Sequence, residues 1–153
     1  MKLHRVTGLR PLGAPPKASS KATSKSMLSN RPRGTRPEVL MRRALRKTGL
    51  TDYKNSCKEI PGRPDIAFPG SKIAVFVHGC FWHRCPRCKL SLPKIHRAFW
   101  KRKFERNVIR DRIKKKLLEK EGWKVFVFWE CQIRKNPYKL ARRVKTYVSS
   151  GKI

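Results

Sequence analysis

The segment that most constrains this chain is HGCFWHRCPRC, which runs from His78 to Cys88 and directly follows an apolar, strand-like run over residues 73–77. It contains three cysteines, two histidines and two large aromatic residues. Thiolates bind metal, imidazoles transfer protons and aromatic rings stack, so three kinds of chemistry meet in this segment. A purely structural zinc module needs only the thiolates. We therefore expect the segment to carry function as well as a metal.

Four of the five cysteines can be grouped as ligands of one metal ion: Cys80, Cys85, Cys88 and Cys131. Zinc prefers four tetrahedral ligands, so four thiolates would form a closed, structural zinc site. In the alternative, Cys131 is an ordinary buried cysteine and His83 completes the shell. The fifth, Cys57, is expected to be an ordinary thiol. Clustered cysteines in a chain without a secretory signal near Met1 favour metal over disulfides, and a reducing compartment.

The charge of the chain is strongly unbalanced, with 40 Lys and Arg residues against 9 Asp and Glu, and a formal net charge of +31. Such a chain repels itself unless a polyanion is bound, which favours nucleic acid as the partner. A membrane surface is the rival partner, but no long apolar run or lipidation signal supports it. The expected location is the cytoplasm, in association with the nucleoid.

Residues 1–33 contain no acidic residue and include several prolines and a Ser/Lys-rich run. Because this composition cannot build a packed core, we expect a disordered basic arm followed by one domain over residues 34–153. A basic, acid-poor beginning is also typical of organellar transit peptides.

Hydrophobic periodicity and turn residues predict a series of elements within the domain. They are a helix over 36–48, strands over 65–68 and 73–77, a long helix over 96–121, a strand over 125–129 and a helix over 138–148. Thr35 and Glu38 have the spacing of a capping box at the start of the first helix. This order indicates a single α/β domain with a small mixed central sheet flanked by helices.

The long helix carries two apolar stripes on different sides: Trp100, Phe104 and Val108 on one, and Ile109, Ile113 and Leu117 on the other. Residues on one helical face recur every three or four positions, so these two sets cannot face the same neighbour. We expect one stripe to face the sheet and the other to meet a partner or a second part of the core.

Three further residues are candidates for a reaction centre. Asp65 stands between a proline and a strand, where its carboxylate can lie at the sheet edge and offer oxygen ligands to magnesium. The alternative is an aspartate that only forms a turn. His78 and His83 can accept and donate protons beside a metal site. Their alternative is to bind zinc or to be hydrogen-bonded in the core.

Two pairs of adjacent aromatic residues, Phe81–Trp82 and Phe99–Trp100, stand among these basic residues. Exposed rings beside positive charge can wedge into a stack of bases. Aromatic side chains also fill protein cores, so we expect each pair to contribute one ring to each purpose.

Four segments, in this order, resemble the very short patch repair (Vsr) endonucleases: GRPDIAF at 62–68, FVHGCFWH at 76–83, AFWKRKFERNVIRD at 98–111 and EGWKVFVFWEC at 121–131. The resemblance extends over most of the chain, from residue 24 to residue 131. It implies a fold similar to the PD-(D/E)xK nucleases and a monomeric DNA repair enzyme. Such an enzyme uses magnesium to nick one strand of duplex DNA on the 5′ side of the thymine in a T:G mismatch.

The resemblance also implies roles for individual residues. Asp65 and the backbone carbonyl of Val77 would bind magnesium. His83, assisted by Glu38, would activate water, and His78 would act near the scissile phosphate or the leaving group. Zinc would hold the loop that carries both histidines. The residues implied to contact DNA are Phe81, Trp82 and Trp100 from the major groove, Met27 from the minor groove, and Asn107 and Arg110 along the long helix.

Two departures from the family pattern stand at the site. Val77 replaces the usual threonine, and Cys85 replaces the usual histidine, with Cys88 displaced by one residue. Cysteine in place of histidine preserves tetrahedral zinc. The alternative function is a zinc-stabilised DNA-binding protein with impaired catalysis, of which Val77 would be the mark. A ribosome-associated RNA-binding protein is a third possibility, which explains the charge and the zinc but not the acid and the histidines.

Overall fold

The computed structural model describes residues 12–14, 16–17, 21 and 33–150, and its centre is a mixed four-stranded sheet. The strands are β1 (Lys54–Asn55), β2 (Ile66–Phe68), β3 (Ile73–His78) and β4 (Lys124–Trp129), in the spatial order β1-β2-β3-β4. The first three pair antiparallel, and β3 and β4 pair parallel, with Ile73 opposite Lys124 and His78 opposite Trp129. A parallel pair needs a long connection, which a helix provides here.

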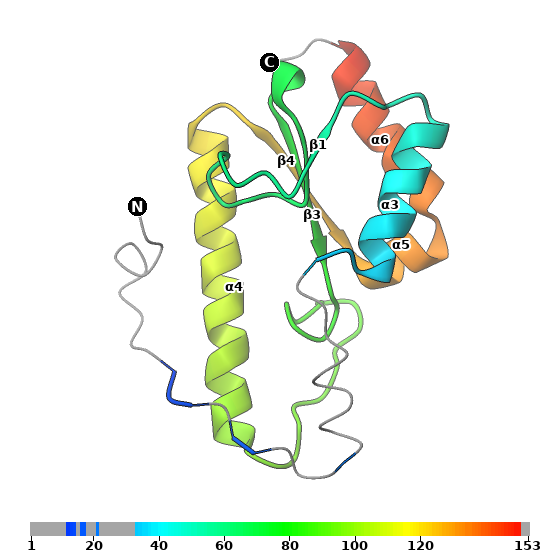
Figure 1. Ribbon diagram of the computed structural model, residues 1–153. Helices are drawn as coiled ribbons and strands as arrows, with labels where there is room; N and C mark the ends of the chain where they lie inside the picture. The colour runs from blue at the N-terminus through cyan, green and yellow to red at the C-terminus, as the bar shows by residue number, and fades with distance from the viewer. Residues whose placement is uncertain (1–11, 15, 18–20, 22–32, 151–153) are drawn as a thin grey trace.

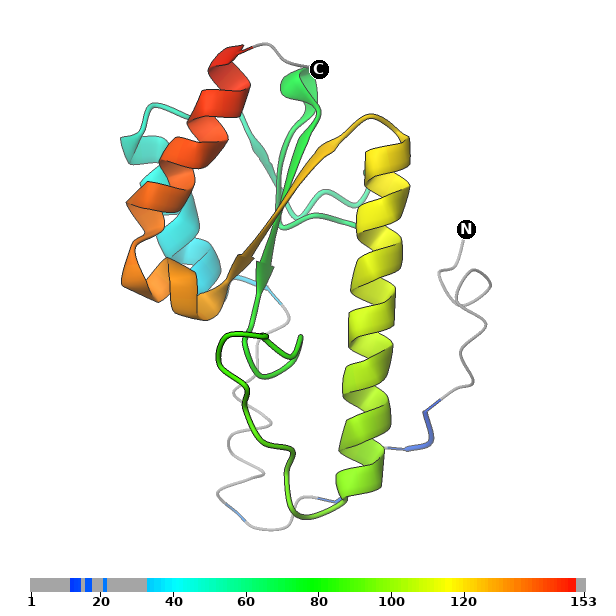
Figure 2. The same cartoon turned by 180° about the vertical axis from the view of Figure 1, so that it is seen from behind.

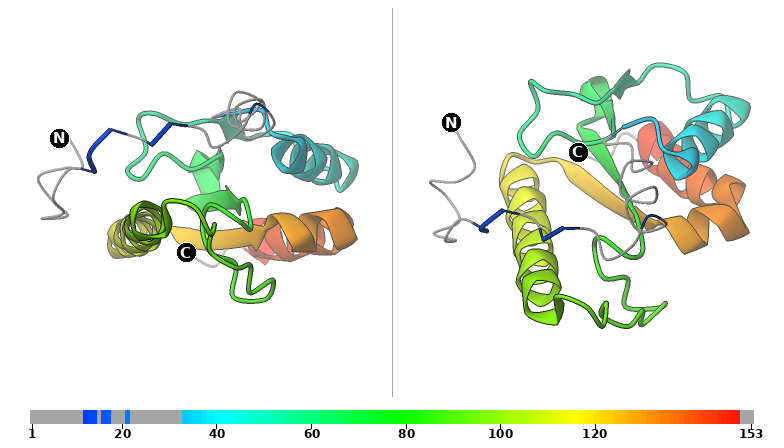
Figure 3. Two further views of the ribbon diagram at one scale, coloured as in Figure 1. Left: turned by 90° about the horizontal axis from the view of Figure 1, so that it is seen from below. Right: turned by 60° about the horizontal axis from the view of Figure 1, so that its bottom comes forward.

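Helices cover both faces of the sheet. They are α3 (Arg36–Lys47), α4 (Arg97–Lys120), α5 (Glu130–Lys135) and α6 (Pro137–Ser150), with a short 3-10 turn, η1 (Pro69–Ser71), between β2 and β3. The connecting helix α4 stands alone on one side of the sheet, and α3, α5 and α6 gather on the other (Figures 1 and 2). Figure 3 shows the same arrangement from below, with the sheet between the two groups of helices. The fold is therefore a small α/β layer structure, as the order of elements predicted.

The two faces of the sheet carry two separate apolar cores, because side chains of a strand alternate between faces. Ile73 and Val75 of β3 pack with Phe126 and Phe128 of β4 in the larger core, which α3, α5 and α6 cover. The intervening Ala74 and Phe76 face the other way and pack against Leu118 of α4. His78 continues this second set at the end of β3. The alternation thus directs His78 towards α4.

Helix α3 begins as the sequence predicted. The Thr35 Oγ1 hydroxyl donates to Glu38 Oε1 over 2.8 Å, and the Thr35 backbone N–H lies 3.4 Å from the same oxygen. The side chain of Glu38 thereby satisfies donors that the first helical turn leaves free. The capping box is confirmed.

The predicted bounds of the main helices and strands agree with the structure to within two residues. Strand β1 and helix α5 were not predicted. On α4, Trp100 and Phe104 of the first stripe are buried, whereas Ile109 and Leu117 of the second are 37% and 40% exposed and remain free for a partner; Leu118, which belonged to neither predicted stripe, is fully buried. The face of α4 towards the sheet changes from apolar to polar in its middle, so apolar residues alone do not mark it. None of the described helices is long and apolar enough to cross a membrane.

Candidate active site and metal centre

The candidate site forms at the edge of the sheet where β3 and β4 end side by side. Because the two strands are parallel, their carboxyl ends meet, and His78 lies opposite Trp129 in the ladder. The segment 79–88 leaves this edge after β3, and Cys131 follows β4 at the same edge. The topology therefore brings together cysteines that are 43 or more positions apart in sequence.

The four expected cysteine ligands form one group. The sulfur atoms of Cys80, Cys85, Cys88 and Cys131 all lie within 4.8 Å of one another, and all four are free thiols. The Cys85 and Cys131 sulfurs are 3.8 Å apart, which matches the separation of about 3.8 Å that tetrahedral zinc–thiolate bonds of about 2.3 Å impose. The Cys131 backbone N–H also points at Cys80 Sγ over 3.4 Å. This donor set fits a single tetrahedral metal ion.

His83 is not part of the thiol group. Its ring stacks on that of His78, with centroids 4.1 Å apart and an interplanar angle of 11°, and its Nδ1 lies 2.5 Å from Asp111 Oδ2. His78, His83 and Asp111 form a second group whose ligand atoms lie within 4.8 Å of one another. The alternative in which His83 completes a zinc shell therefore does not match this geometry, and both histidines remain available for other chemistry.

The environment of His78 favours its neutral form. Burial lowers the pKa of His78 to about 4, and the neighbouring His83 adds to the effect. The ring of Trp129 packs edge-on against it at 5.4 Å between centroids. Desolvation disfavours a charged imidazole, so His78 is uncharged at neutral pH in the free protein.

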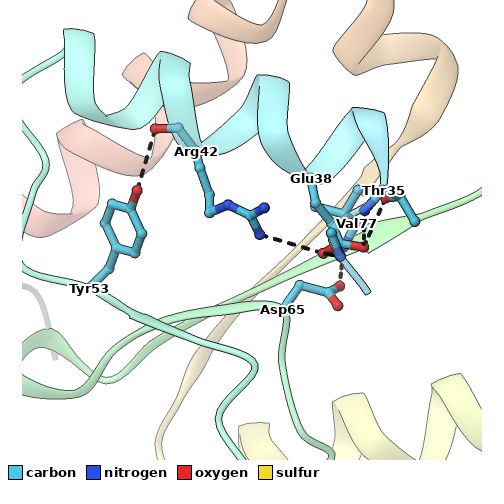
Figure 4. Close-up of polar contacts among 7 residues, drawn as sticks. Thr35, Glu38, Arg42, Tyr53, Asp65 and Val77 are labelled. Carbon is cyan, nitrogen blue, oxygen red and sulfur yellow. Dashed lines mark hydrogen bonds and ion pairs between the residues drawn. The ribbon is translucent and has the colours of Figure 1, made fainter. Parts of the chain in front are cut away.

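Asp65 lies just before β2 and its carboxylate is held from one side. The Val77 backbone N–H donates to Asp65 Oδ2 over 2.7 Å (Figure 4). The pKa of Asp65 is raised to about 6, mainly by burial; the Val77 hydrogen bond acts against this shift, and the negative charge of Glu38 adds to it. A buried carboxylate next to a second one has a local excess of negative charge, which a cation would relieve. The site therefore fits a hard cation with oxygen ligands.

Glu38 is buried and lies beside Asp65 (Figure 4). Besides the contacts of the capping box, its Oε2 accepts the Gly34 backbone N–H over 2.9 Å and lies 3.5 Å from Arg42 Nη1. Among the described residues, the carboxylate that contacts His83 is that of Asp111. Sequence reasoning did not assign Asp111 a role, although the residue ends one of the motifs that carry the resemblance.

The pKa of Asp111 lies below its ordinary value. Burial alone would raise it, but the hydrogen bond from His83 and the surrounding positive charges outweigh burial. Asp111 is therefore ionised at neutral pH and can hold His83 in one orientation. Lys114, one turn further along α4, is a second residue of the site that the sequence did not mark. Its charge acts on both Asp65 and Asp111.

The aromatic residues form one cluster between the loop and α4. The Trp82 and Trp100 rings lie 5.9 Å apart, and Phe81 packs edge-on against Phe104 at 5.0 Å. Phe81, Trp82 and Phe99 are partly exposed, whereas Trp100 is 7% exposed. The Lys103 ammonium lies over the Trp82 ring at 5.2 Å and over Trp100 at 5.0 Å. Aromatic surface and positive charge thus meet beside the histidines.

Asn107 and Arg110 connect α4 to the loop. Asn107 Nδ2 donates to the Trp82 carbonyl over 2.9 Å, and Arg110 Nη2 donates to Asn107 Oδ1 over 2.9 Å. The Nε atom of Arg110 is buried without a hydrogen-bond partner among the described residues. Met27, the remaining predicted DNA-contacting residue, and most of the predicted arm lie outside the described residues.

Comparison with known proteins identifies the family. A family model described as DNA mismatch endonuclease Vsr matches residues 17–89. The type II nicking enzyme V.XorIIP of Xanthomonas oryzae pv. oryzae is 41% identical over 104 residues, which cover 67% of this chain and 75% of that protein. The type II nicking enzyme V.NaeI of Lentzea aerocolonigenes is 38% identical over 122 residues, covering 77% and 73%. The DNA mismatch endonuclease Vsr of Escherichia coli is 36% identical over 115 residues, covering 74% and 73%. The chain therefore belongs to the Vsr family of DNA mismatch endonucleases.

Proposed function

We propose that this protein nicks one strand of duplex DNA on the 5′ side of the thymine in a T:G mismatch, by magnesium-dependent hydrolysis of a phosphodiester. The observation that carries the proposal is that a buried carboxylate, Asp65, shares one edge of the sheet with a stacked pair of histidines and with partly exposed aromatic rings. Metal ligand, proton acceptor and base-stacking surface lie together at one edge of the sheet. We also propose that the fold is of the PD-(D/E)xK nuclease type.

In this proposal, Asp65 and the Val77 carbonyl hold magnesium. When bound, the ion polarises the phosphate and stabilises charge on the attacking and leaving oxygens. The Val77 N–H orients the Asp65 carboxylate by its 2.7 Å hydrogen bond. Since only the backbone of Val77 takes part, valine can stand where the family has threonine.

His83 is proposed to take the proton of the attacking water. With its Nδ1 donating to Asp111, the other ring nitrogen is left as an acceptor. On the basis of this pairing, we propose for Asp111 the assisting role that the resemblance implied for Glu38. Glu38 instead contributes negative charge beside Asp65. His78, neutral in the free protein, is proposed to hydrogen-bond the scissile phosphate or the leaving oxygen.

Mismatch selection is proposed to come from aromatic insertion. A wobble pair unstacks more easily than a Watson–Crick pair, so a ring inserted beside it costs less. Phe81 and Trp82 are partly exposed and suited to this task. Trp100 supports Trp82 in the free protein and would have to turn outward to reach DNA. Met27 is proposed to enter from the minor groove, and zinc in the four-thiol group to keep the loop in place.

The test is a nicking assay on a labelled T:G duplex with magnesium, beside a fully paired duplex and a structured RNA. The wild-type protein should nick only the mismatched duplex. Asp65→Asn should lose nicking by at least about 10³-fold while still binding the mismatch, because the substitution removes a metal ligand and keeps the shape. A T:G duplex left intact by the wild-type protein under several metals would contradict the proposal.

The second candidate is a zinc-stabilised DNA-binding protein with impaired catalysis, which Val77 at the metal site favours. This candidate predicts that the wild-type protein and Asp65→Asn both bind the mismatch and that neither nicks it. Val77→Thr provides the discriminating variant, because it restores the residue usual in the family. Nicking that appears only in Val77→Thr would favour this candidate over the enzyme.

A further inference from the structure

Lys114 lies on the face of α4 that forms the candidate site. Asn107, Asp111, Lys114 and Leu118 follow one another at spacings of four, three and four residues, which places them along one side of the helix. Asn107 is hydrogen-bonded to the Trp82 carbonyl, Asp111 contacts His83, and Leu118 is buried against the sheet. Lys114 thus stands on the side that faces the sheet, and not on the solvent side, where Lys115 and Lys116 are exposed.

The stem of Lys114 is confined by the chain that leads to Asp65. A Cβ atom added at Gly62 would come within 3.1 Å of Lys114 Cβ and 3.4 Å of its Cγ, and within 3.5 Å of Phe76 Cζ. Gly62 has a φ of +77°, which glycine adopts without strain. The backbone at residue 62 therefore lies directly on the aliphatic stem of Lys114, three residues before Asp65.

The ammonium of Lys114 makes no ion pair or hydrogen bond with the described residues. Among the described residues no carboxylate lies within ion-pair distance of it, and it has no hydrogen bond. Burial, followed by the charge of Arg110, lowers its pKa, whereas Asp111 and Asp65 act in the opposite direction. The positive charge of Lys114 in turn acts to lower the pKa of Asp65, His78 and Asp111. Lys114 is therefore a half-buried cation among the groups of the site, with no ion pair or hydrogen bond to the part of the chain that the structure describes.

We infer that Lys114 is a further catalytic residue, whose ammonium contacts the scissile phosphate and stabilises the negative charge that develops there. The inference rests on the proposed nicking function. Glu38, Asp65 and Asp111 place three carboxylates around the site, and these repel a phosphodiester. A fixed cation among them offsets the repulsion and, being already in place, requires no reorganisation during the reaction.

The chemical step balances without a proton from Lys114. The oxygen of water forms a bond to phosphorus as the bond from phosphorus to the leaving sugar oxygen breaks. One water proton passes to His83, and the leaving oxygen takes a proton from solvent while neutral His78 can hydrogen-bond to it. Lys114 remains an ammonium group throughout and acts through its charge alone.

The competing explanation is that Lys114 only covers Phe76 with its aliphatic stem and keeps its ammonium in water. Three variants separate the two explanations. Lys114→Met keeps the stem without the charge, Lys114→Arg keeps the charge, and Lys114→Ala opens space for an added amine. Lys115→Met is the matched control, because the neighbouring Lys115 is exposed and its ion pair to Glu119, at 3.7 Å, lies at the surface.

Single-turnover nicking of a T:G duplex with magnesium is measured for each variant, with duplex affinity and melting temperature measured in parallel. Lys114→Met should reduce the nicking rate about 10²- to 10³-fold, the usual effect of removing one stabilising donor from a reaction centre. Its affinity should change less than about tenfold, because a single phosphate contact is lost. Lys114→Arg should retain part of the activity, and Lys115→Met should nick within about twofold of the wild type.

Chemical rescue supplies the readout that a structural role would not give. Methylammonium should restore part of the nicking by Lys114→Ala in a saturable way, and tetramethylammonium, which cannot donate a hydrogen bond, should not. Two outcomes would overturn the inference about Lys114 but leave the proposed function standing. One is a nicking rate of Lys114→Met within threefold of the wild type. The other is a loss of activity that parallels a lower melting temperature and that methylammonium does not rescue. An inactive wild-type protein would instead overturn the proposed function.

Discussion

At the scale of single residues, Asp65 and His78 show how one desolvated site acts on an acid and a base. Burial raises the pKa of Asp65 to about 6 and lowers that of His78 to about 4. Both effects favour the uncharged form, because a charge is poorly solvated there. The consequences for stability have opposite signs. As pH rises, the fold loses stability because Asp65 ionises more readily in the unfolded chain than in the folded protein. Over a similar interval it gains stability because the unfolded chain no longer binds a proton at His78.

These two residues should therefore mask each other in the dependence of stability on pH. In magnesium-free buffer, Asp65 removes up to about 3 kcal/mol of unfolding free energy as pH rises from about 4 to 6, since one pH unit corresponds to about 1.4 kcal/mol. His78 adds a similar amount between about pH 4 and 6.5. Denaturant unfolding of Asp65→Asn should consequently show stability rising more steeply with pH than in the wild type.

His78→Asn should show the reverse, with stability falling relative to the wild type over the same interval. Each comparison uses the wild-type curve as its control, because all other titrating groups are shared. Parallel curves for the three proteins would mean that neither group is perturbed by burial.

The sequence marks Asp65, His78 and His83 because each stands in or next to a distinctive motif. It does not mark Asp111 or Lys114, whose roles follow from contacts across the fold. Asp111 meets His83 over a separation of 28 residues, and the stem of Lys114 lies against the backbone at Gly62. Such contacts depend on how α4 docks, which periodicity does not specify. Glu38 is the converse case: its capping role is readable locally, but its position beside Asp65 is not.

At the scale of elements, α4 shows that its two apolar stripes have different surroundings. The face towards the sheet begins with Trp100 and Phe104, continues with polar residues at the site and ends with Leu118. The polar residues of the candidate site therefore interrupt the core-facing stripe, and Ile109 and Leu117 of the other stripe stay exposed. Strand β1, with two residues, and α5, which follows β4 without a turn residue, are too short for periodicity to detect.

The neighbouring residues Leu117 and Leu118 offer a direct test of this assignment. Leu118 is fully buried, so Leu118→Ala should cost about 2–5 kcal/mol of unfolding free energy through the cavity it leaves. Leu117 is 40% exposed, so Leu117→Ala should change stability by less than about 1 kcal/mol. Chemical denaturation measures both. Equal losses would show that α4 is rotated relative to the position described.

At the scale of the whole molecule, the four-thiol group joins the two parallel strands at their ends. Metal binding and folding are coupled wherever the unfolded chain cannot form the site. Removal of the metal with a chelator should therefore lower the melting temperature and change the near-ultraviolet circular dichroism of Trp82 and Trp129. Cys131→Ser should have a similar effect, whereas Cys57→Ser, outside the group, should retain the metal. Unchanged spectra after chelation would contradict a structural metal.

The net charge of +31 predicts a strong effect of salt on DNA binding. Neutralising about 8 phosphates gives a slope of about −7 in the logarithm of the association constant against that of salt concentration. Lys114→Met should reduce the magnitude of this slope by no more than about 1, since it removes one phosphate contact. Binding to T:G duplexes at several salt concentrations measures both. A slope near zero would contradict electrostatic binding.

The parallel pairing of β3 and β4 also sets an order of events during synthesis. Cys80, Cys85 and Cys88 leave the ribosome before Cys131, which follows β4. His78 and His83 likewise leave before Asp111, which lies in α4. A nascent chain that ends before β4 has neither all four cysteines of the metal group nor its full sheet. The site can therefore form only after most of the polypeptide has emerged. Truncated translation products should consequently not nick DNA.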